Sequence, residues 1–419
     1  MKRRKFYTFI SLFGISMTLT ILILLTAFLD SSFAPKYPEV FRNRTLYVSD
    51  VRLLDQQNHN SSMNPISPYF VKTYIKTMPM PEKVSMSSNP MPTNTYLNGQ
   101  KAKVWIKYTD AEFWDITQFA FLEGKGFTSE TIKNSDNSVI INDLTRDQYF
   151  GKGVSVVGKS LEIDDVVYRI IGVIKGCPIT QIFVSSDIYL PYNADKSPQK
   201  FGELSGHYIA IILAKSEQDI PSIKQDFISM LGKIPLENDK DVEKRKLGKS
   251  ERSGSGFNPD TIVAHADTYV ESFTNDIAGS DTDSGKSTFF TVLCIFAVLF
   301  MLLPALNLIN INISRIMERA SEIGIRKAFG ASAGTLTLQF IIENVIITLI
   351  GGVLAIILSL IFIAYLNQNG VGPIKTLNLG INWFVVLIAM ILSLLFGLMS
   401  GAYPAWRMSK LAVVDALKT

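Results

Sequence analysis

Four long apolar runs dominate the pattern of hydrophobic and polar residues along the chain. They cover residues 6–29, 287–314, 344–366 and 376–406, and none of them contains Asp, Glu, Lys or Arg. Each run exceeds the roughly 18 apolar residues that mark a helix crossing a bilayer, whereas a buried helix of a soluble protein is shorter and apolar on one face only. The pattern therefore predicts four transmembrane helices, with the first inside residues 1–30 and the others at about 287–314, 336–366 and 381–405.

The first run also has a second interpretation, because four basic residues precede it, as in a secretory signal. The apolar part of such a signal is only ~7–15 residues long and ends at a cleavage site with small residues. This run is longer, no such site ends it, and Pro35 follows the sequence SSFA. We therefore predict an anchor that is not cleaved.

Charged residues flank the runs unevenly. The N-terminus carries +4, the segments 315–327 and 407–419 each carry +2, and residues 30–286 carry about −4, against a total of +4. Because Lys and Arg are retained on the cytoplasmic side, we expect both termini and the 315–327 segment inside and the large segment outside. A hydrophobic fraction of 47% and a mean hydropathy of +0.22 fit such a mixture of membrane helices and one large external domain.

The external segment interleaves the patterns of strands and helices. Strands are predicted at residues 45–54, 101–110, 138–141, 161–174, 206–214 and 261–270. Helices are predicted at residues 67–78, 142–150 and 217–231. Loops are predicted at the polar segments 56–66, 79–99 and 237–258. The interleaving predicts an α+β domain with two subdomains. Cys177 lies in this domain and Cys294 in the second run, so we expect no disulfide between them.

The sequence GVSVVGKS, residues 153–160, matches the pattern of a phosphate-binding loop. That loop needs a strand before it and a helix after it, so that backbone amides face the phosphates. Here a helical pattern precedes it and a strand pattern follows, which predicts an ordinary turn. The three histidines show no spacing typical of metal ligands. We expect no catalytic, cofactor or metal site, and hence no enzyme activity, in this chain.

Two pairs of residues inside the apolar runs suggest contacts between helices. Asn307 and Asn310 lie at helical spacing in the second run, and amides in a bilayer need partners. Gly397 and Gly401 form a G-x-x-x-G motif, which lets helices approach closely, although the motif is also common by chance. We predict helix packing at the asparagines, and either packing or no special role at the glycines.

The short loop between the second and third runs contains EIGIRKAFGAS, residues 322–332. Glu322 can pair with Arg326 one turn later, so the preceding helix can continue into the cytoplasm. A topological turn would explain the basic residues but not the glycines or the paired charges, which a docking surface for another protein explains. The predicted surface comprises Glu318, Glu322, Ile323, Gly324, Ile325, Arg326, Lys327 and Gly330.

Three stretches resemble MacB/FtsX-type ABC-transporter permeases. NISRIMERASEIGIRKAFGAS followed by LQFIIE is similar to their segment between two membrane helices, and SGAYPAWRMSKL to their C-terminal signature. VIINDLTRDQYFGKGVSVVGKSLEIDDVVYRIIGVI resembles their periplasmic core domain. The resemblance implies an α-helical membrane protein with four transmembrane helices plus a large α+β periplasmic domain, built from a porter-like part and an inserted β-rich part.

The same resemblance implies a division of the chain and a set of partners. Residues 1–30 would hold the first transmembrane helix, 31–285 the MacB-like periplasmic core domain, and 286–419 the FtsX-like permease domain with its cytoplasmic coupling segment at 315–335. The coupling segment would dock on a separate ABC ATPase subunit, which binds the ATP. A similar permease would form a homodimer or heterodimer, with a periplasmic adaptor as a further partner and no nucleic acid.

Two features depart from the family pattern. Only MKRRK precedes the first run, where the family has an amphipathic helix, and Val413 stands where the family has a proline. We nevertheless expect an inner-membrane permease or mechanotransmission subunit that couples ATP hydrolysis by its partner to movement of the periplasmic domain. The alternative is a membrane-anchored sensor or scaffold without ATPase coupling. An ion-coupled carrier would need ionisable residues within its membrane helices, and the four runs contain none.

Overall fold

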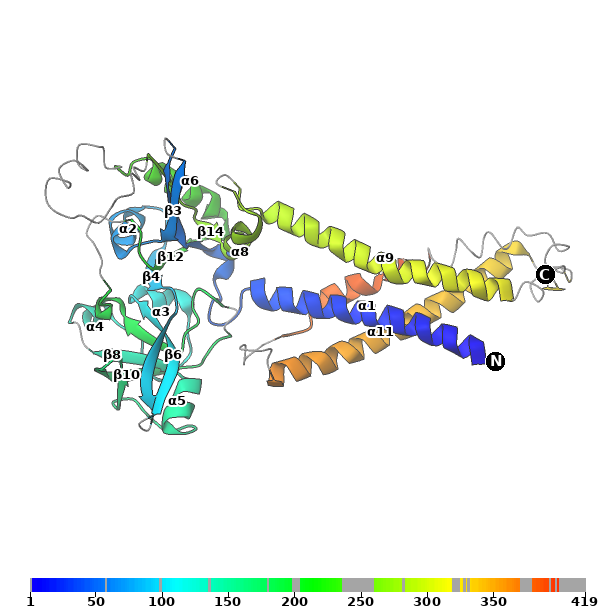
Figure 1. Cartoon of the computed structure of the whole chain (residues 1–419), viewed down its shortest axis with the longest axis horizontal. Helices are drawn as coiled ribbons and strands as arrows, with labels where there is room; N and C mark the ends of the chain where they lie inside the picture. The colour runs from blue at the N-terminus through cyan, green and yellow to red at the C-terminus, as the bar shows by residue number, and fades with distance from the viewer. Residues whose placement is uncertain are drawn as a thin grey trace. The chain divides into compact units, whose positions relative to one another are not determined.

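The computed structural model describes residues 2–56, 59–97, 100–134, 137–178, 181–197, 204–235, 260–280, 283–318, 325–326, 329, 332–369, 379–391, 393–395 and 398. The chain divides into two compact units (Figure 1). We call Met1–Ser32 together with Ser287–Thr419 the helical unit, and Phe33–Lys286 the core domain.

The helical unit contains long helices at the predicted apolar runs. They are α1 (Lys2–Phe33), α9 (Lys286–Glu318) and α11 (Ala333–Asn369), followed by a shorter apolar helix at Trp383–Leu395. Among the described residues, Phe9–Phe33 and Ile341–Asn369 are long and apolar enough to cross a membrane. Within this unit, the N-terminal ends of α1 and α11 lie at the same end as the C-terminal end of α9 (Figure 1).

Small residues let the helices of this unit approach one another. A Cβ added to Gly351 of α11 would lie 2.8 Å from a methyl carbon of Ile15 on α1, and one added to Gly352 would lie 2.3 Å from the sulfur of Met390. The buried Thr20 hydroxyl donates to the carbonyl of Ser16 in its own helix and also lies 3.3 Å from the Ala355 carbonyl of α11. Thus α11 packs between α1 and the last apolar helix.

The packing residues that the sequence suggested stay predictions. Asn307 and Asn310 lie on α9, but their side chains are outside the described part of the structure, as are Gly397 and Gly401. The adjacent pair Gly351 and Gly352 was not singled out from the sequence, because two neighbouring glycines have no fixed spacing motif.

One half of the core domain, which we call the sheet half, is an antiparallel sheet with helices packed against it. Its strand order is β4 (Lys83–Ser88), β12 (Tyr208–Leu213), β1 (Thr45–Val48) and β14 (Asp267–Thr268). Leu46 and Ile212 contribute to a core with α2 (Pro68–Thr73) and α6 (Ile220–Leu231), whereas Tyr47 and Ile211 contribute to a second core with α3 (Glu112–Thr117). Burial on both faces explains why β1 and β12 are apolar without alternation.

The other half, which we call the barrel half, is a ring of strands. The ring runs β6 (Gln100–Thr109), β11 (Ile188–Pro191), β8 (Ser138–Asn142), β10 (Val166–Ile174), β9 (Ser160–Ile163), β5 (Met91–Leu97) and back to β6. Alternate residues such as Val104, Ile106, Ile163 and Ile170 fill its interior. Strand β7 (Phe121–Gly124) pairs with β10, and α5 (Asp143–Phe150) follows β8. The predicted α+β class and the inserted β-rich part are therefore both present.

Several predicted elements need correction. The predicted strand 45–54 is two strands, since β1 joins the main sheet while β2 (Asp50–Asp55) joins a small sheet with β3 (Asn60–Pro65) and β13 (Thr261–Val263). The predicted strand 161–174 is the hairpin β9–β10, which turns at Asp164 and Asp165 with positive φ angles. The predicted strand 261–270 breaks into β13 and β14 and gives way to α8 (Tyr269–Ala278), because Thr268 and Glu271 form a capping box that begins a helix.

The predicted loops 56–66 and 79–99 were also wrong, because they contain β3, β4 and β5. Strand β3 is a sheet edge whose polar side chains face solvent, so its composition resembles that of a loop. Strand β4 buries Ser85, Ser87 and Ser88. The hydroxyls of Ser85 and Ser88 can be buried because Asp110 and the N–H of Tyr108 form hydrogen bonds with them. The predicted loop 237–258 lies outside the described residues.

Candidate functional site

The predicted coupling surface is described at only a few side chains. Ile325 is half exposed, and the Arg326 guanidinium donates to the side-chain oxygen of Gln339 on α11, at 3.1 Å. Helix α9 continues past the apolar run to Glu318, as predicted, but the side chain of Glu318 is not described. Glu322, Ile323, Gly324, Lys327 and Gly330 fall outside the described residues, so the pairing of Glu322 with Arg326 stays a prediction.

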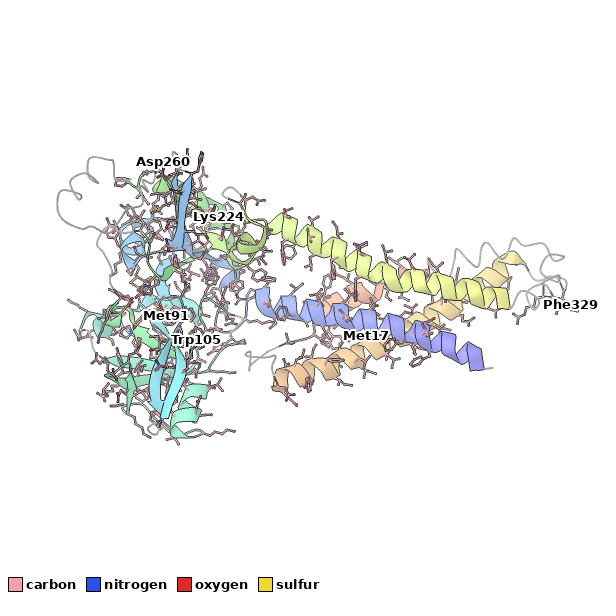
Figure 2. The ribbon with its side chains drawn as sticks, in the orientation of Figure 1. Met17, Met91, Trp105, Lys224, Asp260 and Phe329 are labelled. Atoms are coloured by element: carbon pink, nitrogen blue, oxygen red, sulfur yellow. The ribbon has the colours of Figure 1, made fainter. Side chains whose placement is uncertain are left out.

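Phe329 is the functional candidate that sequence reasoning missed. Its side chain is 89% exposed, and its backbone N–H donates to the carbonyl of Ile325 at 3.1 Å, which places both side chains on one turn. Figure 2 labels it near the C-terminal end of α9 and the N-terminal end of α11. An exposed aromatic residue beside an exposed isoleucine and an arginine is typical of a protein-docking surface. The signal in the sequence was that Phe329 is the one aromatic residue in the segment 315–335.

A second candidate region lies within the core domain, on the two segments that adjoin α1 and α9 in sequence. On the segment that leads from α1 to β1, Glu39 and Arg42 are both buried and form an ion pair. The hydroxyl of Tyr47 donates to the other oxygen of Glu39 at 2.6 Å. The Arg42 guanidinium also donates to the carbonyl of Ala34. A buried ion pair of this kind is satisfied only while all its partners stay in place.

The segment that leads to α9 joins the same contacts. The guanidinium carbon of Arg42 lies 3.8 Å from the centre of the Tyr269 ring on α8, a cation–π geometry. Burial raises the pKa of the Tyr269 phenol to about 12, so that it stays neutral. Phe33, the last residue of α1, packs edge-to-face against Phe273 of α8 at 5.2 Å. We call Phe33, Glu39, Arg42, Tyr47 and Tyr269 the Arg42 cluster.

Backbone pairing reinforces this connection. Strands β1 and β14 are antiparallel neighbours, with Leu46 opposite Thr268 and Tyr47 opposite Asp267. Because β14 runs directly into α8, the two segments of the core domain that adjoin α1 and α9 in sequence are bound to each other by hydrogen bonds and by the Arg42 cluster.

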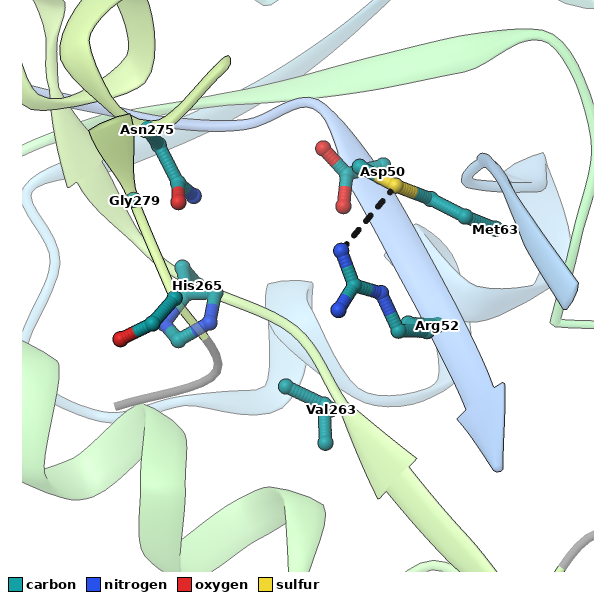
Figure 3. Close-up of a pocket in the computed structure, with 8 residues that line it drawn as sticks. Asp50, Arg52, Met63, Val263, His265, Asn275 and Gly279 are labelled. Atoms are coloured by element: carbon teal, nitrogen blue, oxygen red, sulfur yellow. Dashed lines mark hydrogen bonds between the residues drawn. The ribbon is translucent and has the colours of Figure 1, made fainter. Parts of the chain in front are cut away.

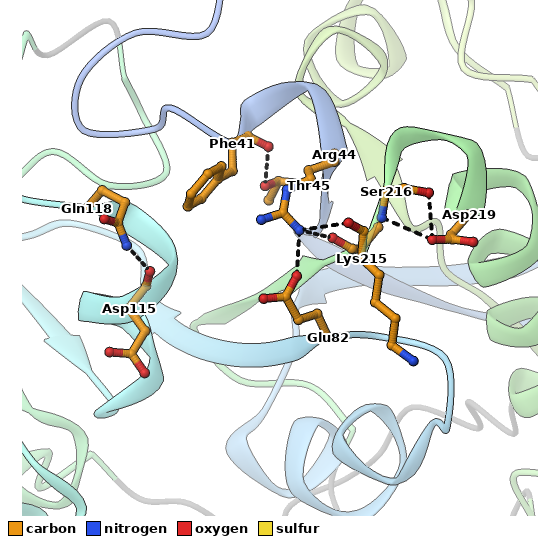
Figure 4. A network of polar contacts seen from close by, with 10 residues as sticks. Phe41, Arg44, Thr45, Glu82, Asp115, Gln118, Lys215, Ser216 and Asp219 are labelled. Atoms are coloured by element: carbon orange, nitrogen blue, oxygen red, sulfur yellow. Dashed lines mark hydrogen bonds and ion pairs between the residues drawn. The ribbon is translucent and has the colours of Figure 1, made fainter.

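Both segments are also fixed to the rest of the sheet half. The Arg44 guanidinium reaches Glu82 and the carbonyls of Ala214 and Lys215, and Figure 4 shows these contacts around the start of β1. On the other segment, Lys224 of α6, labelled in Figure 2, pairs with Glu271 of α8. A displacement of either segment would therefore be transmitted to the sheet.

The segment 153–160, which matches the phosphate-loop pattern, is a turn in which backbone N–H groups already donate hydrogen bonds within the protein. The N–H of Val156 donates to the Glu123 carboxylate at 3.0 Å, the N–H of Gly158 to the Ile170 carbonyl, and the N–H of Lys159 to the Val156 carbonyl. Strand β9 follows, as predicted. The Glu123 carboxylate therefore accepts a hydrogen bond from a backbone N–H that a bound phosphate would need as a donor.

The core domain also contains a cavity of about 320 Å³. Figure 3 shows its lining residues, with Asp50 and Arg52 of β2 near His265. Arg52 points toward Met63 of β3 and lies 3.5 Å from its sulfur. Within the described part of the chain, no three His, Cys, Asp or Glu side chains converge in a geometry that could hold a metal ion. This cavity therefore offers no metal centre from described residues.

Comparisons with known proteins agree with these observations. The model of the MacB-like periplasmic core domain matches residues 8–229, and that of the FtsX-like permease C-terminal region matches residues 294–413. The macrolide export ATP-binding/permease protein MacB of Acinetobacter baylyi is 23% identical over 322 residues, which are 76% of this chain and 43% of that protein. The uncharacterized ABC transporter permease YknZ of Bacillus subtilis is 25% identical over 325 residues, which are 76% of this chain and 72% of that protein.

The extracellular domain of YknZ, solved as a crystal structure, aligns with a TM-score of 0.35 and 15% identity over 49% of this chain and 96% of that one. The chain spans a little under half the length of the MacB relatives it matches. The model of the MacB-like core domain covers more than half of the chain, and the permease model covers most of the remainder. The chain therefore belongs to the MacB/FtsX-like family of ABC-transporter permeases.

Proposed function

We propose that this chain is a permease or mechanotransmission subunit, in which ATP hydrolysis by a separate ABC ATPase moves the core domain. The observation that carries the proposal is the Arg42 cluster, because it joins the two segments that adjoin α1 and α9 in sequence. A relative movement of the two helices would be resisted by this cluster and passed to the sheet through β1 and β14. The chain itself supplies no nucleotide site in this proposal, and the ATPase binds the ATP.

The ATPase would dock at residues 318–330, where Ile325, Arg326 and Phe329 are exposed. Truncating an aromatic residue at the centre of an interface typically costs 2 kcal/mol or more, about 30-fold in affinity. We expect Phe329→Ser and Gly330→Leu to reach the membrane normally and to lose co-purification with the ATPase. Glu322→Ala should behave in the same way, although loss of one exposed ion pair costs the helix only ~0.3–0.5 kcal/mol.

Transmission and docking can be separated by a change in the core domain. Tyr269→Leu removes the ring that faces Arg42 while leaving the Glu39–Arg42 pair in place. We expect this variant to retain the ATPase but to lose transport or any other output of the assembled complex. Arg169→Met, an exposed change elsewhere in the core domain, is the control. Normal output from Tyr269→Leu would contradict the proposed transmission. Normal pull-down and stimulated hydrolysis in all three loop variants would favour a sensor or scaffold.

The proposed topology has four membrane helices in the inner membrane, both termini in the cytoplasm and the core domain in the periplasm. In a background without the two native cysteines, single cysteines can replace Asn60, Lys240, Gly372 and Lys327. An impermeant reagent should label the first three in spheroplasts and spare the fourth. Labelling at 327 with protection at 240 would invert the topology. Crosslinking of single-cysteine variants of α9 would then distinguish a homodimer from a heterodimer with a similar permease.

A further inference from the structure

A cleft of about 410 Å³ in the core domain has no role in the coupling described above. Its lining comes from both halves of the domain: α2 and the 3₁₀ helix η2 (Ile75–Thr77) on one hand, α4 (Ser129–Lys133) and the 3₁₀ helix η3 (Tyr192–Ala194) on the other. Sites for small molecules typically enclose about 300–1,000 Å³ and combine an apolar lining with a few placed polar groups. The cleft has the size of such a site, and its lining is richer in charged groups than is typical.

The two carboxylates in the cleft are already occupied by protein groups. The Lys76 ammonium lies 2.9 Å from Asp110 and 3.4 Å from Glu112. Asp110 is buried and also accepts hydrogen bonds from the Ser85 hydroxyl, at 2.6 Å, and from the N–H of Met86, at 3.1 Å. The charges of Lys76 and of these two acids are therefore paired with one another at the side of the cleft.

Two further lysines line the cleft and lack such partners. The Lys72 ammonium of α2 lies 4.2 Å from the centre of the Tyr192 ring, and Lys133 ends α4. Among the described residues, neither lysine forms an ion pair with a carboxylate. With three lysines against two acids, the cleft carries a net charge of +1. Ile132 and Tyr192 contribute apolar surface to the lining, whereas Met86 lies fully buried behind it.

We propose that this cleft binds a small organic monoanion, namely a carboxylate attached to an aromatic or apolar group. The carboxylate would lie between Lys72 and Lys133, and the apolar group would pack against Ile132 and Tyr192. A phosphate dianion fits less well, because the lining contains no arginine to form a bidentate contact. A second negative charge would also be repelled by the acid pair beside Lys76. This site is independent of the proposed ATPase coupling.

The test uses the full-length protein in lipid nanodiscs and 4-(trifluoromethyl)benzoate as the probe, followed by ¹⁹F NMR. Empty nanodiscs give the partition of the probe into lipid, which is subtracted. The neutral isostere 4-(trifluoromethyl)benzamide has the same ring and nearly the same shape. We expect saturable binding of the benzoate, with the benzamide at least about tenfold weaker, which corresponds to about 1.4 kcal/mol. The corresponding aryl phosphate should bind no better than the benzoate.

Lys72→Gln and Lys133→Gln keep the exposed side chains polar and shorten them by one atom, and each removes one charge. Each should weaken benzoate binding about tenfold, and the double variant should abolish saturation. Lys159→Gln, which removes an exposed lysine from the turn before β9, is the matched control and should bind as the wild type does. The proposal is overturned if the benzamide binds as well as the benzoate, if the double variant binds normally, or if no saturable binding is found. ATPase pull-down is unaffected in every case, so failure here leaves the coupling proposal standing.

Discussion

Replacing Lys107 by methionine tests how the core domain tolerates a buried charge. Lys107 lies near the end of β6, where the outward face of the barrel half is covered, and its side chain is fully buried. Its ammonium donates to the Ser88 carbonyl of β4 at 2.6 Å. Burial lowers the pKa of Lys107 from 10.5 to about 7, with smaller opposing effects from Cys177 and Glu39.

The sign of the effect follows from this lowered pKa. Between pH 7 and 10.5 the unfolded chain binds a proton at Lys107 that the folded domain does not, so the free energy of unfolding rises with pH across that window. Below pH 7 the folded domain must bury the charge. The pKa of Lys107 differs by 3.5 between the unfolded and the folded chain, which corresponds to a total change of about 5 kcal/mol in the free energy of unfolding. About 4 kcal/mol of this change occurs between pH 6 and pH 10.

Lys107→Met keeps the length of the side chain and removes this pH dependence. It also leaves the Ser88 carbonyl without its donor, at a cost of about 1–3 kcal/mol at any pH. We therefore expect the variant to be more stable than the wild type at pH 6, by about 2–4 kcal/mol, and equal or less stable at pH 10.

The assay is urea unfolding of the full-length protein in nanodiscs, with Trp383 and Trp406 replaced by phenylalanine so that fluorescence reports the core domain. Lys103→Met is the matched control, because Lys103 is exposed on the same strand. It should leave the difference in unfolding free energy between pH 6 and pH 10 unchanged. The reasoning fails if Lys107→Met shifts stability by the same amount at both pH values, since the ammonium would then not be buried in its charged form.

Three further changes test other parts of the structure. Arg42→Met strands the buried Glu39 carboxylate and should lower the free energy of unfolding of the core domain by about 3–5 kcal/mol in the same urea assay. Gly351→Leu should clash with Ile15 and lower the thermal midpoint of the helical unit, whereas Gly334→Leu, with no such close neighbour, should not; equal midpoints would argue against the packing of α1 on α11. Lys159→Ala should leave ATP hydrolysis by the assembled complex unchanged, and a loss of hydrolysis in an intact complex would mean that the 153–160 turn does bind nucleotide.

The elements predicted correctly are those whose signal is local. The helix at 217–231 is seen as a 3₁₀ turn followed by α6, because its apolar residues recur on one face and a serine caps its start. The strand 101–110 appears as β6 with its alternation intact. The length of each apolar run is enough to locate a helix, because it does not depend on which residues that helix contacts.

The elements that were missed depend on distant partners. Ser85 and Ser88 are of a residue type that is common in loops. Their place in a buried strand depends on hydrogen bonds of the Ser85 hydroxyl with Asp110 and of the Ser88 carbonyl with Lys107. The Arg42 cluster could not be found either, because a charged residue in the segment FRNR is predicted to be exposed, and its burial depends on Tyr269 far along the chain. The coupling segment, in contrast, was predicted from its glycines and paired charges and from its resemblance to the family, and Phe329 within it was found only by its exposure in the folded chain.

The junction between the two halves of the core domain shows why the buried Lys107 is retained although it costs stability. Strands β4 and β6 share only one paired position, Ser87 opposite Thr109. Around it, Lys107 and Asp110 reach across to Ser88, Ser85 and Met86. Apolar contacts at this crossing would be stronger but would not favour one register, whereas directed hydrogen bonds are satisfied in a single register. We infer that the polar junction fixes how the barrel half is attached to the sheet half, so that Lys107→Met gains stability at pH 6 while losing this specificity.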